Sequence, residues 1–94
     1  MVFAKQLRER IRRGEITRTV RIWQRCHVKV GGRYRMGAGC VVVTVILPIE
    51  LADVTGSLAR QCGFKGVVDL LKVAQHGPGR NVFLIDFHYE EKRP

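Results

Sequence analysis

Threonine and arginine side chains alternate in a short stretch near the start of the chain. Thr17, Thr19 and Arg21 occupy every second residue, a spacing that places them on one side of an extended strand. Hydroxyl and guanidinium groups donate hydrogen bonds to phosphate oxygens and to base edges. The pattern therefore predicts a nucleic-acid contact, and its alternative is a polar strand side that simply faces solvent.

Arg18 belongs to the opposite side of the same strand, among aliphatic side chains. A guanidinium group in apolar surroundings needs an anionic partner, because burying an unpaired charge is costly. Glu50, Asp86 or a bound phosphate would each serve as that partner. The sequence thus leaves structural pairing and ligand contact equally open for Arg18.

Positive charge is concentrated in the first third of the chain. Residues 1–35 carry eleven Lys or Arg and two Glu, whereas residues 36–94 carry six basic and six acidic residues. Nine of the eleven are Arg, whose planar fork binds phosphate bidentately and whose flat face stacks on bases. This asymmetry indicates a polyanionic partner, with a basic surface that only aids solubility as the alternative.

The hydrophobic pattern predicts three helices and four strands. The expected helices are 3–13, a second from Asp53 or Thr55 to Cys62, and 66–75; the expected strands are 16–23, 33–36, 40–51 and 81–89. Gly14 and Gly63 follow two of these helices, where a C-terminal glycine is favoured. The order predicts an α+β fold: a small, partly open β-barrel with flanking short helices.

The two longest strands differ in how their sides are patterned. Nearly every residue from Cys40 to Leu51 is aliphatic or β-branched, so this strand is expected to be buried on both sides or to close the barrel. Pro48 predicts a bulge or an exit to an edge. In the last strand, Asp86 and His88 share one side.

Length and composition predict one domain over residues 1–94, with residues 1–2 and 90–94 frayed. No apolar run is long enough to span a membrane, and the N-terminus lacks the apolar centre of a signal peptide. The three cysteines are widely spaced, so free thiols rather than a disulfide framework are expected. These features predict a cytoplasmic location; they leave the oligomeric state open.

Short motifs along nearly the whole chain resemble the ASCH domain, a relative of the PUA domain. The family pattern is a glycine followed by lysine, threonine, threonine or glutamate, and arginine at set spacings, and Gly14, Thr17, Thr19 and Arg21 match it. The resemblance implies a PUA-like β-barrel and RNA binding. In one short bacterial branch it implies hydrolysis of acetylated cytidine by a lysine, the second threonine and a glutamate. Here Ile16 replaces the lysine, and Cys62 aligns near the glutamate.

The first hypothesis is therefore an RNA-binding module with a basic cleft, with Thr17 and Thr19 at its floor. Its expected contact residues are Arg12, Arg13, Thr17, Arg18, Thr19, Arg21, Arg33 and Arg35. The alternative is an enzyme on nucleosides or RNA, either an N4-acetylcytidine-type amidohydrolase or a ribonuclease. It would use Thr19, Arg21 and Tyr34, and the replaced lysine disfavours the amidohydrolase. A third hypothesis is a partner protein whose basic face binds an acidic protein.

Other candidate chemistry is weaker. Cys26, His27 and the remaining Cys and His residues lack the spacing of zinc ligands, so neither a metal nor another cofactor is expected. Trp23 and Tyr34 lie among arginines and would allow base stacking, but a single Trp in a small domain favours the core.

Overall fold

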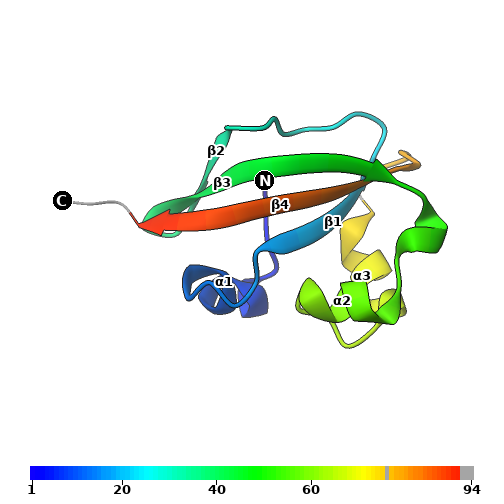
Figure 1. The fold of residues 1–94 in the computed structure, drawn as a ribbon, viewed down its shortest axis with the longest axis horizontal. Coiled ribbons are helices and arrows are strands. Elements are labelled where there is room, and N and C mark those ends of the chain that lie inside the picture. Colours follow the sequence, from blue (N-terminus) through cyan, green and yellow to red (C-terminus); the bar gives the residue numbers. More distant parts are fainter. Residues whose placement is uncertain (76, 92–94) are drawn as a thin grey trace.

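The computed structural model describes residues 1–75 and 77–91. They form a small α+β domain, drawn in Figure 1, in which a four-stranded antiparallel sheet curves into a half-barrel beside short helices. The elements are α1 (Lys5–Arg12), β1 (Arg18–Trp23), β2 (Arg33–Met36), β3 (Gly39–Ile49), a 3₁₀ turn η1 (Leu51–Asp53), α2 (Gly56–Gln61), α3 (Val67–Ala74) and β4 (Asn81–Glu91). This confirms the predicted fold class and the partly open β architecture.

β4 is an inner strand of the sheet, although it comes last in the sequence. The strand order is β1-β4-β3-β2, and β4 pairs with β1 on one side and with β3 along its whole length on the other. The first strand therefore reaches the rest of the sheet only through β4. Thr44 is the extra residue of a bulge in β3, where the register with β4 shifts between Val43 and Val45.

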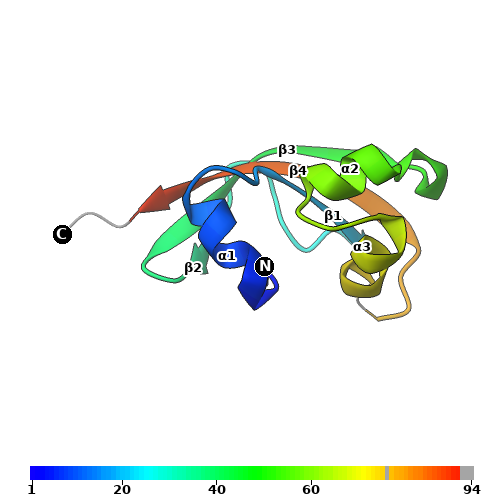
Figure 2. The same cartoon turned by 90° about the horizontal axis from the view of Figure 1, so that it is seen from below.

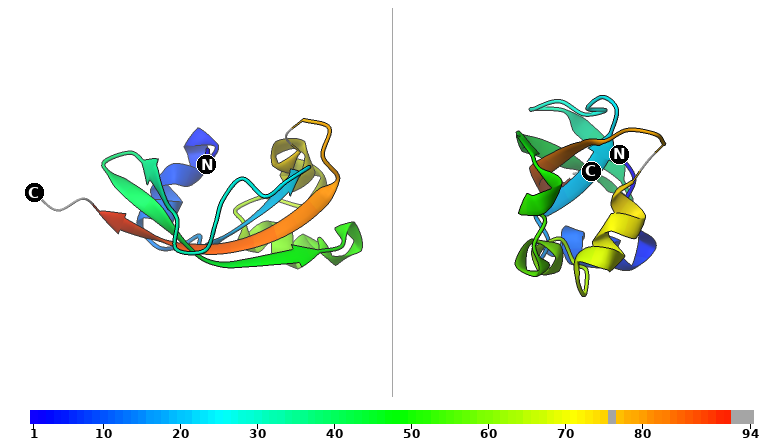
Figure 3. Two further views of the ribbon diagram at one scale, coloured as in Figure 1. Left: turned by 90° about the horizontal axis from the view of Figure 1, so that it is seen from above. Right: turned by 90° about the vertical axis from the view of Figure 1, so that its right-hand side faces the viewer.

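Alternate side chains of β4 are covered by different parts of the chain. Val82 and Leu84 pack with α2 and α3, Ile85 packs under the connection between β1 and β2, and Phe87 packs against α1. The strong twist of the sheet places all three helices below it in Figure 1 and in front of it in Figure 2. The connection between β1 and β2 crosses the other side (Figure 3).

Local signals place the helix ends close to their predicted positions. The Thr55 side chain caps α2 by accepting a hydrogen bond from the Leu58 amide at 3.2 Å, so Thr55, not Asp53, is the N-cap. Gly63 follows that helix with φ of +93°, and Gly14 follows α1 with φ of +77°. The first helix begins at Lys5, two residues later than predicted, and Phe3 packs beside it in the core.

The prediction that residues 40–51 are buried on both sides is wrong for the second half of the strand. Val41 to Val43 are buried, but Val45 and Leu47 are about half exposed. The reason is that β2 pairs only with residues 39–42, so the rest of β3 is an edge. Pro48 lies in this stretch, which pairs with β4 but extends beyond the end of β2, in agreement with the predicted exit to an edge.

The described ends of the chain are more ordered than expected. Glu90 and Glu91 extend β4 and pair with Cys40 and Gly39, so the strand runs two residues beyond its predicted end. At the start of the chain, Met1 packs against the core. Residues 92–94, also expected to be frayed, lie outside the described residues.

Candidate nucleic-acid interface

One side of the sheet gathers charged and polar side chains from all four strands. Residues directly opposite each other in antiparallel strands project to the same side, and the pairs Arg18–Asp86, Cys40–Glu90 and Arg35–Cys40 stand in this relation. Alternation along β2 and β4 adds the remaining members. We call this surface the charged face; its residues are Arg18, Arg33, Arg35, Cys40, Asp86, His88 and Glu90.

Arg18 is paired at one end of the charged face. Its Nε and Nη2 donate to the two carboxylate oxygens of Asp86 at 2.7 and 3.2 Å, and its Nη1 donates to Gln61 Oε1 at 3.1 Å. The hydrogen bonds to Asp86 raise the pKa of Arg18. Of the partners considered from the sequence, Asp86 is therefore the one found. The side chains of Arg18 and Asp86 are 37% and 30% exposed, so this pair is open to solvent.

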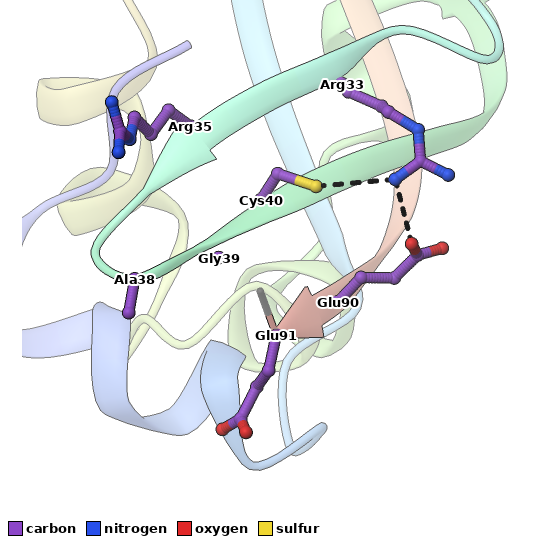
Figure 4. Close-up of a pocket in the computed structure, with 7 residues that line it drawn as sticks. All are labelled: Arg33, Arg35, Ala38, Gly39, Cys40, Glu90 and Glu91. Carbon is purple, nitrogen blue, oxygen red and sulfur yellow. Dashed lines mark hydrogen bonds and ion pairs between the residues drawn. The ribbon is translucent and has the colours of Figure 1, made fainter. Parts of the chain in front are cut away.

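Glu90 joins two basic side chains at the other end. Its Oε1 accepts a hydrogen bond from Arg33 Nη1 at 2.8 Å, and its Oε2 lies 2.8 Å from His88 Nε2. The same Arg33 nitrogen is 3.6 Å from Cys40 Sγ (Figure 4). Two hydrogen bonds lower the pKa of Glu90: the one to His88 has the larger effect and the one to Arg33 the smaller. The bond to Glu90 in turn raises the pKa of Arg33.

Each end of the charged face opens into a hollow. A hollow of about 480 Å³ is lined by Arg33, Arg35 and Glu90, with Glu91 at its margin (Figure 4). A second, of about 540 Å³, is lined by residues that include Glu15, Thr17, Arg18 and Asp86. Both are large enough for a phosphate group or a nucleotide base, which makes the face accessible to a polyanion.

The end of α1 brings two more arginines next to these hollows. Arg12 is 2.8 Å from Glu9 and 3.8 Å from Glu91, which lines the first hollow. Arg13 is 3.0 Å from Glu15, which lines the second. The charged face with its margin therefore includes six of the eight predicted contact residues: Arg12, Arg13, Thr17, Arg18, Arg33 and Arg35.

Thr19 and Arg21 lie elsewhere. They are 7% and 4% exposed, on the other side of β1, beneath the N-terminal segment. The Arg21 guanidinium sits 4.9 Å from the centre of the Phe3 ring, and its Nη2 donates to the Val2 carbonyl at 2.5 Å. Burial lowers the pKa of Arg21 to about 10. The alternating Thr-Arg pattern thus forms neither a cleft floor with Thr17 nor a solvent-facing strand side.

In comparisons with known proteins, no family model, curated sequence or solved structure matches the chain. The resemblance to the ASCH domain consequently rests on the short motifs alone.

The three positions aligned with the ASCH amidohydrolase residues are all buried. Ile16, Thr19 and Cys62 are 2%, 7% and 1% exposed. Ile16 packs against the end of α2, where a side chain added to Gly63 would meet its Cδ1 atom. Tyr34, the third residue of the hypothetical enzyme, packs with Trp23, and its hydroxyl accepts a hydrogen bond from the Lys29 amide at 2.9 Å.

Burial also determines how the cysteines react. It raises the pKa of the Cys62 thiol to about 11, whereas Cys26 and Cys40 are only half-buried. Since the thiolate is the nucleophile, iodoacetamide at pH 8 should alkylate Cys62 at least about tenfold more slowly than Cys26 or Cys40. Peptide mass spectrometry over time measures the three rates. In denaturant the rates should become similar, and equal rates in the folded protein would contradict the buried position of Cys62.

The remaining sequence candidates have structural roles. Trp23 is buried in the core, as favoured, and His27 stacks on it with ring centres 4.5 Å apart. Among the described residues, no three His, Cys, Asp or Glu side chains group as metal ligands, and no helix is long and apolar enough to cross a membrane.

Proposed function

We propose that this chain is an RNA-binding module that holds the sugar-phosphate backbone on the charged face. One observation carries the proposal: Arg18, Arg33 and Arg35 project from one side of the sheet, and Arg12 and Arg13 lie beside the same two hollows. Arginine is the side chain best suited to bidentate phosphate contacts.

The carboxylates on this surface do not oppose binding strongly. The pairs of Arg12, Arg13 and Arg33 with glutamates are all 40% or more exposed on both sides. Exposed pairs of this kind contribute little to stability, so phosphate can replace carboxylate at little cost. Release of counterions from the RNA then favours association.

The half-barrel and the match at Gly14, Thr17, Thr19 and Arg21 support a PUA-like, ASCH-type module and favour RNA over DNA. Three free cysteines support action in a reducing, cytoplasmic setting. The alternative enzyme on nucleosides or RNA draws no support from the buried side chains of Ile16, Thr19 and Cys62.

Fluorescence anisotropy of a labelled RNA hairpin tests the proposal. With five arginines contacting phosphates, affinity should fall roughly 100-fold or more between 50 and 200 mM salt. A DNA hairpin of the same sequence should bind more weakly. Absence of salt-sensitive association with RNA would exclude the function, and equal affinity for DNA would exclude the preference for RNA.

A further inference from the structure

The side chain of Glu90 holds a position on the charged face that an external anion would suit. One carboxylate oxygen contacts Arg33 and the other contacts His88, each at 2.8 Å. Arg35 lies on β2 with Arg33 and lines the same hollow, but its guanidinium points away from the contact between Arg33 and Glu90 (Figure 4). A carboxylate between two basic groups resembles a phosphate in charge and in acceptor geometry.

Glu90 is also able to leave this position without disturbing the fold. Its side chain is 42% exposed, and that of Arg33 is 60% exposed. The hollow of about 480 Å³ that Arg33 and Glu90 line leaves room for a phosphate group beside their contact (Figure 4). The backbone of Glu90 stays paired with Cys40 whichever way the side chain points.

We propose that Arg33 and His88 form a phosphate subsite that Glu90 occupies in the free protein and vacates when an RNA phosphate binds. This inference rests on the proposed function for the identity of the ligand, but the subsite itself is defined by its contacts. Glu90 acts as an internal competitor, so it weakens RNA binding.

His88 supplies the second contact of this subsite. On its own strand it is flanked on the same side by Asp86 and Glu90, and Val42 lies opposite it on β3. Arg33 faces it across Glu90, while α1 packs on the other side of the sheet. The ring nitrogen that contacts Glu90 becomes available to a phosphate oxygen once the Glu90 side chain leaves.

Two charge-matched variants test the competition by Glu90. Glu90→Gln should tighten binding of the RNA hairpin by roughly five- to tenfold, because one charge-assisted contact is freed for phosphate. Asp69→Asn removes the same charge from α3, where screening should keep the change below roughly twofold. No tightening in Glu90→Gln, or equal tightening in both variants, would overturn the subsite.

The contribution of His88 has its own control. His88→Gln should weaken RNA binding, because the ring that contacts the anion is lost. His27→Gln should leave RNA affinity unchanged, because His27 stacks on Trp23 away from the charged face. Equal affinities of the two variants would overturn the role of His88.

A titration with inorganic phosphate separates the subsite from the RNA function. At constant pH, phosphate should shift the His88 ring signals in the NMR spectrum until the shift saturates. Half of the full shift should be reached at a lower phosphate concentration in Glu90→Gln than in the wild type. That result without RNA binding would retain the subsite and reject the proposed function. RNA binding without any phosphate-induced shift at His88 would retain the proposed function and reject the subsite.

Discussion

Replacing Gly79 by alanine should unfold most of the protein at 25 °C. A Cβ atom at this position would overlap the backbone nitrogen of Gln24 and the carbonyl carbon of Trp23. Neither atom can move aside as a flexible side chain would, since both belong to the main chain where β1 ends. The main chain at Gly79 and that at the end of β1 must therefore separate.

That separation breaks the contacts between the end of β1 and the segment that leads into β4. Gln75 Nε2 donates to the Gly79 carbonyl at 2.7 Å, and Asn81 Nδ2 donates to the Gln24 carbonyl at 2.8 Å. The expected loss exceeds about 4 kcal/mol, which is most of the stability of a small domain. Urea unfolding followed by circular dichroism measures it.

Gly66→Ala is the matched control. No atom lies within 4 Å of the added Cβ, and the backbone there is extended, with φ of −168°. The free energy of unfolding should change by less than about 1 kcal/mol. If Gly79→Ala unfolded at the same urea concentration as Gly66→Ala, the close contact between Gly79 and Gln24 would not exist.

Local pattern predicted the elements well because each is specified by neighbouring residues. The alternation of Arg33–Met36 and the stop at Gly63 are both short-range signals, and the structure follows them within about two residues. The exposure of Val45 and Leu47 was not predictable in this way. It depends on where β2 ends, and the sequence of β3 contains no information on the length of its partner.

The candidate site was predictable only in part, because its residues come from strands that are far apart in the sequence. The arginines were visible in the charge distribution, but their partners were not. Asp86 and His88 were seen to share one side of a strand, whereas their contacts with Arg18 and Glu90 depend on strand register and on side-chain direction. Arg21 was misplaced because the N-terminal residues that cover it lie about twenty positions away.

Removing both arginines of β2 should have the largest effect on function. Arg33→Ala with Arg35→Ala should weaken RNA binding roughly 10- to 100-fold and lower the salt slope by about 1.5–2, as expected for two lost phosphate contacts. Both side chains are exposed, so the free energy of unfolding should change little. Anisotropy titrations at several salt concentrations measure both quantities.

Two comparisons decide what such a loss means. Lys65→Ala with Lys72→Ala removes the same charge from outside the charged face and should cost less than roughly threefold, because distant charges are screened. Arg21→Met should leave RNA affinity unchanged in the folded protein, since the guanidinium already binds the Val2 carbonyl beneath Phe3. Equal losses in the two double variants would mean that net charge alone attracts RNA. A loss in Arg21→Met would mean that the N-terminal segment must open and that RNA enters beneath it.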